Sequence, residues 1–229
     1  MTLSVIVPAW NEAHRIGRCV EAWAARGPLE LVVVDDGSTD RTAEFARQAA
    51  PAGLDLKVVS IAHQGKGAAT RAGMLASRGA RALLCDCDLS ADLDDLPRLE
   101  AALDAGADVA VGSRETTGAA RVRSQPLHRR ALGRAFSLAM RALGLSALED
   151  TQCGFKLFTR AAAHRLFAES KVDGYAFDVE ILWLARRAGL CVVEVPIRWR
   201  DDTDSRVRPV ADGVAMLTDA LRVRRLHRR

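Results

Sequence analysis

Short apolar runs alternate with amphipathic segments along the first half of the chain. The runs consist mostly of Val, Leu, Ile and Ala, and they lie at 3–9, 29–36, 56–61, 80–86 and 107–113. The segments between them have the length and polarity of helices, and they lie at 13–25, 41–50, 67–78 and 94–105. Apolar strands that alternate with helices predict right-handed βαβ units. The first half therefore predicts an α/β fold, in which helices flank a mostly parallel sheet.

The second half of the chain has a less regular pattern. Residues 128–144 place apolar side chains on one face of a helix. Two more helices are expected at 178–188 and 210–226, and strands are expected within 150–160 and at 190–199. No repeat, low-complexity tract or linker interrupts the sequence. We therefore expect a single domain that spans residues 1–229.

Polar segments directly follow three of the predicted strands. They read PAWNE after the first strand, DDGSTD after the second and DCDLS after the fourth. In parallel α/β sheets, ligands bind beyond the carboxyl ends of the strands. The three segments therefore predict a ligand site at that edge. Turn formation and helix capping are the alternative roles for Asp35 and Asp36.

Asp86 and Asp88 stand two residues apart where the fourth apolar run stops. If the strand continued through both, their side chains would point the same way and repel each other unless a cation or donors compensated. The chain has neither G-x-G-x-x-G nor a P-loop. A metal held by carboxylates is another common way to neutralise a diphosphate. The pair thus predicts a metal-bound diphosphate or, alternatively, two carboxylates solvated in a loop.

The composition limits the classes of protein that this chain can be. Its 229 residues are 49% hydrophobic and 27% charged, which is ordinary for a soluble globular domain. No apolar run approaches the roughly 18 residues of a membrane span, and the first strand begins too early to leave room for a signal peptide. The 5 cysteines form no C-x-x-C pair, so neither a disulfide framework nor a structural zinc site is expected. We expect a cytoplasmic protein.

The net charge of +4 is modest, but arginines cluster at 121–134 and at 222–229. Such clusters suit a nucleic acid, an anionic membrane or a phosphorylated substrate. A solvated tail is the alternative for the last residues. Nucleic acid is the least favoured partner, because the sequence contains no recognition module and no continuous basic stripe.

Taken together, these segments resemble the family 2 glycosyltransferases of the GT-A fold, specifically the polyprenyl- and dolichyl-phosphate sugar synthases. The resemblance spans nearly the whole chain in the family's order. It is carried by VIVPAWNE, VVVDDGSTDRT, HQGKGAATRAG, DCDLSAD, VGSR, DTQCGFKLFTR, YAFDVEIL and SRVRP. The last three look most like the dolichyl-phosphate glucosyltransferase branch.

The resemblance implies that residues 1–113 bind a nucleotide sugar and that residues 114–229 bind the acceptor. The donor residues would be Pro8, Trp10, Glu12, Val34, Asp35, Asp36, Lys66, Asp86, Cys87, Asp88 and Arg114. Asp86 and Asp88 would be the DxD motif, which binds Mg²⁺ or Mn²⁺ together with the donor diphosphate. Lys66 could instead lie in a mobile loop, and Arg114 could be a surface arginine. A uridine donor is expected over a guanosine donor.

The resemblance also implies the reaction: inverting transfer of glucose, or of mannose, from a nucleotide diphosphate sugar to a polyprenyl phosphate. Arg206 and Arg208 would bind the acceptor phosphate, although relatives usually carry lysine at the position of Arg206. Asp150 or Asp178 would act as a base or orient the acceptor, and Asp178 could instead serve the helix dipole. A soluble hydroxyl acceptor and a non-catalytic nucleotide-sugar-binding protein remain as alternatives.

Synthases of this branch commonly carry membrane segments, and this sequence shows none. The helix at 128–144 and the arginine-rich C-terminal helix could rest peripherally on an anionic bilayer, at the cytoplasmic face of the membrane. Core packing is the alternative for the first of these helices. A soluble acceptor would also fit the absence of a membrane segment.

Overall fold

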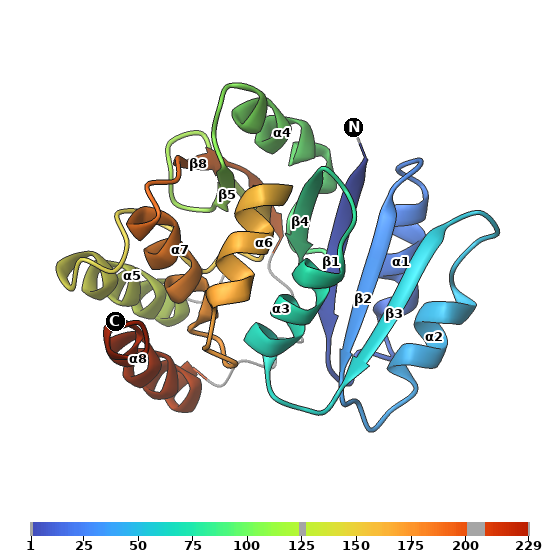
Figure 1. The fold of residues 1–229 in the computed structure, drawn as a ribbon, viewed down its shortest axis with the longest axis horizontal. Helices are drawn as coiled ribbons and strands as arrows, with labels where there is room; N and C mark the ends of the chain where they lie inside the picture. The colour runs from blue at the N-terminus through green and yellow to red at the C-terminus, as the bar shows by residue number, and fades with distance from the viewer. Residues whose placement is uncertain (1, 124–126, 201–208, 229) are drawn as a thin grey trace.

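The computed structural model of the chain describes residues 2–123, 127–200 and 209–228. Seven strands form one sheet with the order β3-β2-β1-β4-β7-β5-β8. Their bounds are β1 (Leu3–Ala9), β2 (Glu30–Asp36), β3 (Asp55–Ile61), β4 (Arg81–Cys85), β5 (Val109–Ser113), β7 (Phe155–Thr159) and β8 (Val192–Pro196). β7 runs antiparallel to both of its neighbours, and the other neighbouring strands are parallel. The mostly parallel sheet expected from the apolar runs is confirmed (Figure 1).

Helices cover both faces of this sheet (Figure 1). Three helices pack with the same core cluster on one face: α1 (Ile16–Ala24), α2 (Thr42–Gln48) and α4 (Leu96–Asp104). The other face is covered by α3 (Lys66–Ala76), α6 (Arg160–Glu169) and α7 (Phe177–Arg187). Alternate residues of β2 enter the two clusters, with Leu31 and Val33 on one side and Val32 and Val34 on the other. This two-sided burial explains why β2 appears in the sequence as a continuous apolar run rather than an alternating one.

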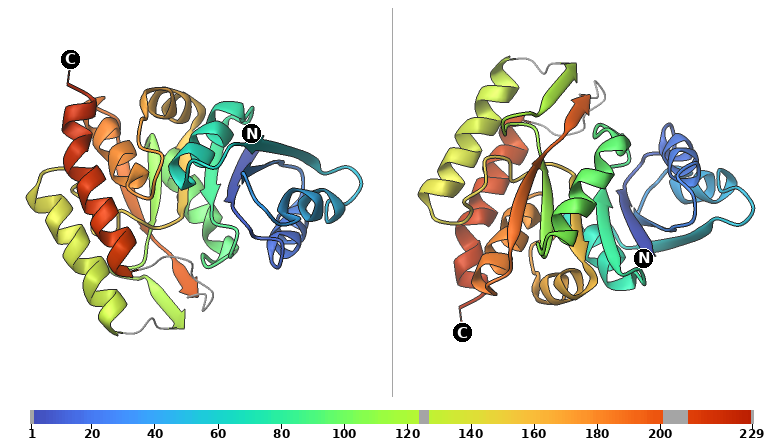
Figure 2. Two further views of the ribbon diagram at one scale, coloured as in Figure 1. Left: turned by 90° about the horizontal axis from the view of Figure 1, so that it is seen from below. Right: turned by 90° about the horizontal axis from the view of Figure 1, so that it is seen from above.

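Two further helices form an outer layer at the β8 end of the molecule. They are α5 (Leu127–Ala142) and α8 (Pro209–Leu226), which lie side by side against α7 (Figure 2). Met140 of α5, Val179 of α7 and Ala220 of α8 pack in one small apolar cluster. Core packing therefore occupies one face of α5. In the described part of the chain, no helix combines the length and the hydropathy that a membrane span requires.

The sequence pattern misses three features of the second half. Residues 160–169, left unassigned, form α6, whose N-cap Thr159 accepts a hydrogen bond from the Ala162 amide. The strand expected at 190–199 is two strands, because the chain leaves the sheet at Ile197. Beyond that point β9 (Arg198–Arg200) pairs in parallel with β6 (Ala120–Arg123), which the pattern did not predict. Asp95 fixes the departure by accepting hydrogen bonds from the Arg198 backbone amide at 2.6 Å and from its guanidinium.

Candidate active site

The turns after β1 and β2 are tied to each other by side-chain hydrogen bonds. The Ser38 hydroxyl accepts from the Asn11 amide at 2.8 Å, and the Asn11 side-chain oxygen accepts from the Thr39 amide at 2.8 Å. The Thr42 hydroxyl accepts from the Glu12 amide at 2.8 Å. Asn11 has a φ of 54°, a left-handed conformation that asparagine tolerates better than most residues. The PAWNE and DDGSTD segments, both predicted to bind the donor, are therefore tied into one edge of the sheet.

The Asp35 and Asp36 carboxylates both accept backbone hydrogen bonds that stabilise this edge. Asp35 accepts a hydrogen bond from the Ser38 amide at 3.1 Å, which is the turn role anticipated as its alternative. The Asp36 carboxylate accepts from the Gln64 and Gly65 amides, each at 2.9 Å, and so joins the end of β2 to the segment after β3. These contacts leave a ligand-binding role for the two carboxylates as a prediction.

The other residues predicted to bind the donor after β1 and β2 differ in how much of their side chains is accessible. Pro8 and Val34 are register partners in β1 and β2, and the Val34 side chain is fully buried in the core, so it offers a ligand no accessible surface. Glu12 is buried and forms an ion pair with Arg15. Trp10 is 41% exposed, and it is the member of the set with a large accessible surface.

His63 completes this edge, and no motif in the sequence singles it out. Its ring stacks on Trp10 with centroids 4.5 Å apart and an interplanar angle of 16°. Its Nδ1 lies 2.9 Å from an Asp36 carboxylate oxygen, which fixes the ring's orientation. The available signal was its position directly after β3, at the same sheet edge as PAWNE and DDGSTD.

The segment containing Asp86 and Asp88 is a turn rather than a continuation of β4. The Asp86 amide donates to the Gly154 carbonyl at 3.2 Å, and Asp88 accepts from the Ser90 amide at 2.9 Å. Leu89 has a φ of 53°. A Cβ on Gly154 would lie 1.9 Å from an Asp86 carboxylate oxygen. The glycine in DTQCGFK is therefore required by the close approach of the Asp86 side chain.

Charge compensation in this turn is incomplete. Lys66 Nζ lies 2.6 Å from Asp86 Oδ1, so GKG places its lysine at the carboxylates. Burial would lower the pKa of Lys66, but Asp86 and Asp178 outweigh burial and raise it. Burial and the charge of Asp86 together raise the pKa of Asp88, against the weaker opposing effects of the Ser90 amide, Arg15 and Lys66. A second cation would relieve the repulsion that Asp88 experiences.

The residues of this turn fit a hard divalent cation when ligands from elsewhere complete its shell. Among the described residues, no group of three or more His, Cys, Asp or Glu side chains could hold a metal. Asp86 and Asp88 supply carboxylate oxygens, which suit Mg²⁺ or Mn²⁺. Further oxygens would have to come from a bound donor. Cys87 and Ser90, which flank Asp88, are buried.

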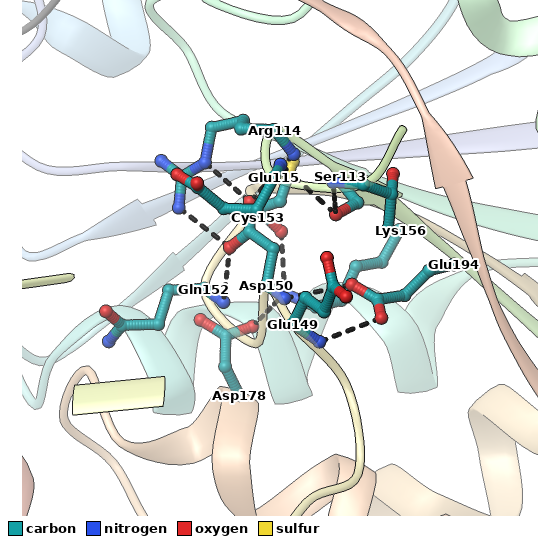
Figure 3. Close-up of polar contacts among 11 residues, drawn as sticks. Ser113, Arg114, Glu115, Glu149, Asp150, Gln152, Cys153, Lys156, Asp178 and Glu194 are labelled. Carbon is teal, nitrogen blue, oxygen red and sulfur yellow. Dashed lines mark hydrogen bonds and ion pairs between the residues drawn. The ribbon is translucent and has the colours of Figure 1, made fainter. Parts of the chain in front are cut away.

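Arg114, which follows β5, and Asp150, which precedes β7, form a buried bidentate ion pair (Figure 3). Arg114 Nε and Nη2 donate to the two Asp150 oxygens at 2.7 and 2.8 Å, and the Arg114 amide donates at 3.0 Å. Burial works to raise the pKa of Asp150, but the charge and hydrogen bonds of Arg114 hold it below its usual range. The arginine also lies over the Trp199 ring, 4.9 Å from its centroid. Arg114 is therefore not a free surface arginine.

Lys156 and Asp178 form a second buried ion pair nearby (Figure 3). Lys156 Nζ donates to Asp178 Oδ1 and to the Cys153 carbonyl, both at 2.6 Å. Burial raises the pKa of Asp178, although Lys156 and Lys66 oppose the shift. Lys156 was not selected from the sequence, and a lysine inside the apolar run GFKLF was its signal.

The structure brings the predicted donor residues to one edge of the sheet, with Asp150 and Asp178 beside them. Arg206 and Arg208, the residues predicted to bind the acceptor phosphate, lie outside the described residues. Their role remains a prediction from the sequence.

Comparisons with known proteins agree with this arrangement. Residues 4–167 match the family model described as glycosyl transferase family 2. A dolichyl-phosphate beta-glucosyltransferase of Drosophila melanogaster is 35% identical over 242 residues, covering 96% of this chain and 73% of the relative. The Homo sapiens protein of the same name is 33% identical over 241 residues, covering 97% and 74%.

Solved structures also share the fold. Glucosyl-3-phosphoglycerate synthase from Mycobacterium tuberculosis, in complex with Mn²⁺, uridine diphosphate and glucosyl-3-phosphoglycerate, superposes with a TM-score of 0.73. The match covers 97% of this chain and 78% of that one at 23% identity. The expected GT-A architecture is therefore confirmed.

Proposed function

The chain belongs to glycosyltransferase family 2, and from that premise we propose that it transfers glucose from a nucleotide diphosphate sugar to a polyprenyl phosphate. Its relatives in Drosophila melanogaster and Homo sapiens are named dolichyl-phosphate beta-glucosyltransferases, and each aligns with nearly all of this chain. Glucose is favoured over mannose because both names specify glucosyl transfer, and uridine is favoured over guanosine because DTQCGFKLFTR and YAFDVEIL resemble the glucosyl branch. The donor would bind at the edge formed by Trp10, Asp35 and the Asp86 turn.

One observation favours a phosphate acceptor over a hydroxyl acceptor. Both carboxylates that could serve as a general base are buried and engaged by a cation: Asp150 by Arg114 and Asp178 by Lys156. A hydroxyl nucleophile needs a base within hydrogen-bond reach. A phosphate is already an anion near neutral pH and needs no proton removed.

The proposed step is a single displacement. A phosphate oxygen of the acceptor attacks the anomeric carbon and forms the new C–O bond. The bond from that carbon to the donor diphosphate breaks, and its electron pair leaves with the diphosphate. Attack opposite the leaving group inverts the anomeric centre, so an α-linked donor gives a β-linked product. The protein's main tasks are to align the two phosphates and to stabilise the released charge.

Charge stabilisation is assigned to Lys66, Asp86 and Asp88. A divalent cation bound by the two carboxylates would neutralise the leaving diphosphate. Lys66 lies 2.6 Å from Asp86 and supplies a fixed positive charge at the same place. The second ion pair at Asp178 lies close enough for its charge to affect Lys66. Acidic and basic side chains therefore lie together where negative charge would develop on the leaving diphosphate.

The outer layer of α5 and α8 is proposed as the surface that meets an anionic membrane. Leu138 of α5 is 65% exposed, and Leu217 and Leu221 of α8 are 40% and 53% exposed. The two α8 leucines are four residues apart and share a face, with the exposed Arg225 beside them. Leucines that enter the interface and arginines that meet anionic headgroups are the usual elements of such a surface.

A donor and acceptor screen tests the proposed reaction. Uridine diphosphate glucose and guanosine diphosphate mannose are each incubated with a short polyprenyl phosphate or with the matching polyprenol, and released nucleotide diphosphate is measured. We expect turnover with the uridine donor and the phosphate acceptor. Turnover with the polyprenol instead would support the hydroxyl acceptor. Nucleotide binding without turnover on any acceptor would support the non-catalytic alternative.

Sedimentation with liposomes tests the proposed membrane surface. Binding to vesicles rich in an anionic lipid should fall as salt rises, because exposed charges are screened over about 10 Å at 0.1 M ionic strength. Leu217→Ser combined with Leu221→Ser should weaken binding without reducing activity on a detergent-dispersed acceptor. Equal binding of neutral and anionic vesicles would contradict the electrostatic part of the proposal.

A further inference from the structure

A continuous series of hydrogen bonds connects the end of α8 with the beginning of α3, where Lys66 lies. We propose that Glu180 is a positioning residue for the reaction, and that His227 locks it in place from the C-terminal helix. Through segment 170–174, Glu180 would hold the first turn of α3 so that Lys66 reaches Asp86. The inference rests on the proposed function, because it assigns the donor site a support from outside that site.

Glu180 lies in α7 and is completely buried. Its Oε1 accepts from the Lys171 amide and its Oε2 from the Val172 amide, each at 2.9 Å. His227 Nε2 lies 2.7 Å from Oε1. A buried carboxylate is costly unless its oxygens are paired. The three contacts join segment 170–174 and the end of α8 to the Glu180 carboxylate of α7. We call this cluster of Lys171, Val172, Glu180 and His227 the Glu180 junction.

Segment 170–174 in turn caps α3. The N-cap of α3 is Gly65, which makes no side-chain capping bond. The Asp173 carbonyl accepts instead from the Gly67 amide at 2.7 Å and from the Ala68 amide at 3.2 Å. The first amides of a helix have no partner within it. Asp173 therefore supplies from another segment the cap that α3 lacks.

The fit between this segment and α3 is close. A Cβ on Gly67 would lie 2.3 Å from the Val172 carbonyl oxygen, and one on Gly65 would lie 2.6 Å from the Asp173 carbonyl oxygen. Arg71, one turn further along α3, donates to Asp173 Oδ1 at 2.6 Å. Backbone contacts this tight pass a displacement of the segment directly to the helix.

Lys66 is the first residue of α3, so the position of this first turn sets the position of its ammonium group. Nζ lies 2.6 Å from Asp86 Oδ1 and is largely buried. A misplacement of about 1 Å in a group that aligns reactants can cost on the order of a hundredfold in rate. The support of α3 by Asp173 is therefore expected to affect donor binding and turnover.

The last turn of α8 is fastened to the same junction from the other side. Besides the His227–Glu180 contact, Lys171 Nζ donates to the Leu226 carbonyl at 2.7 Å, and Arg187 donates to the His227 carbonyl at 2.8 Å. α8 is also the helix that carries the proposed membrane-facing leucines. The end of α8 at Leu226 and His227 is thus linked, through segment 170–174, to the position of Lys66.

Two variants and one matched control test this link. Glu180→Gln keeps the volume of the side chain but replaces one acceptor oxygen with an NH2 group, so either the Lys171 or the Val172 amide loses its acceptor. His227→Gln weakens only the contact between the end of α8 and the Glu180 carboxylate. Arg224→Ala is the control, because Arg224 anchors α8 to the Leu143 carbonyl of the loop after α5 and does not contact the Glu180 junction. Melting temperatures of all three variants are measured first.

Amide hydrogen exchange gives a readout that does not depend on activity. Exchange of the Gly67 and Ala68 amides should become faster in Glu180→Gln, and to a smaller degree in His227→Gln, while Arg224→Ala should match the wild type. Calorimetry with uridine diphosphate and Mn²⁺ gives the second readout. We expect affinity to fall about tenfold in Glu180→Gln, with KM for the acceptor unchanged, since the displaced group aligns the donor.

The outcomes separate this inference from the proposed function. Unchanged exchange at Gly67 and Ala68 in both variants would overturn the link between Glu180 and α3. Faster exchange with unchanged donor affinity and turnover would overturn the positioning role. If the wild type neither binds nor turns over a nucleotide sugar, the proposed function fails, and the exchange measurement still decides whether the link exists.

Discussion

Asp88, which is half-buried, and Asp150, which is buried, both lie near the carboxyl edge of the sheet, yet their pKa values shift in opposite directions. Burial and the neighbouring Asp86 raise the pKa of Asp88. Arg114 outweighs burial and lowers the pKa of Asp150. The turn after β4 therefore contains more negative charge than its neighbours neutralise, whereas Asp150 and Asp178 are each paired with a cation from another element, Arg114 and Lys156 respectively.

This difference indicates different tasks. A carboxylate with a two-pronged arginine partner is held in one geometry and is a weak base. A pair of carboxylates that share one lysine has a reason to bind a further cation. The Arg114–Asp150 pair therefore fixes the structure beside the site. The Asp86 and Asp88 pair is suited to a ligand that brings a cation and a diphosphate together.

The largest expected effect comes from removing charge at the turn after β4. Asp88→Asn should lower turnover by about a hundredfold or more, the usual scale for losing a group that stabilises transition-state charge. A chelator should do the same to the wild type, and Mg²⁺ or Mn²⁺ should restore it. The measurement is release of nucleotide diphosphate. Full turnover in excess chelator would show that Asp86 and Asp88 do not act through a metal.

The buried ion pairs of Asp150 and Asp178 should respond in stability rather than through a metal. Lys156→Met leaves the Asp178 carboxylate buried without its partner, which should cost about 3–5 kcal/mol in the free energy of unfolding. Adding Asp178→Asn removes the stranded charge and should recover much of the loss. Denaturant titration of the single and double variants measures both values. An equal loss in both would mean that the pair's charges do not determine stability here.

The sequence predicts the two regions unequally. The strands up to β5 were predicted because each contains a short apolar run, which is largely buried in all of them except the edge strand β3. The position of the Asp86 turn follows from where β4 stops. The ion pairs were not predicted. Arg114 and Asp150 meet only because β7 is inserted antiparallel between β4 and β5, and strand order of this kind is not written in local periodicity.

Local pattern also fails where polar contacts rather than apolar runs define an element. β6 reads ARVR and has too few apolar residues to signal a strand, and β9 begins where Asp95 binds Arg198. His63 was missed because its stacking on Trp10 joins residues that follow β1 and β3, two strands separated by β2 in the sheet. The general location of the site was therefore predictable, and its detailed chemistry depended on tertiary contacts.

A smaller effect is expected at the predicted acceptor site. Arg206→Ala or Arg208→Ala should raise KM for a polyprenyl phosphate and lower turnover by roughly 10–150-fold, the scale of one charge-assisted contact of about 1.5–3 kcal/mol. Asp178→Asn should retain measurable activity, because an anionic nucleophile needs no base. Steady-state kinetics on folded variants gives both numbers. A folded but inactive Asp178→Asn beside active arginine variants would favour a hydroxyl acceptor.

The smallest effect, and the most direct test of the comparison, is the pH dependence of stability in Asp88→Asn and Asp150→Asn. Because the folded pKa of Asp88 is raised, its ionised form destabilises the protein above that pKa, so Asp88→Asn should melt at a higher temperature than the wild type at pH 7. The gain should vanish as pH falls below the unfolded pKa of about 3.9, where both states are protonated.

Because the folded pKa of Asp150 is lowered, its ionised form stabilises the protein, so Asp150→Asn should melt at a lower temperature at pH 7. That deficit should shrink as pH falls through the folded pKa. Shifts of the same sign in the two variants would show that the two regions do not differ in charge compensation.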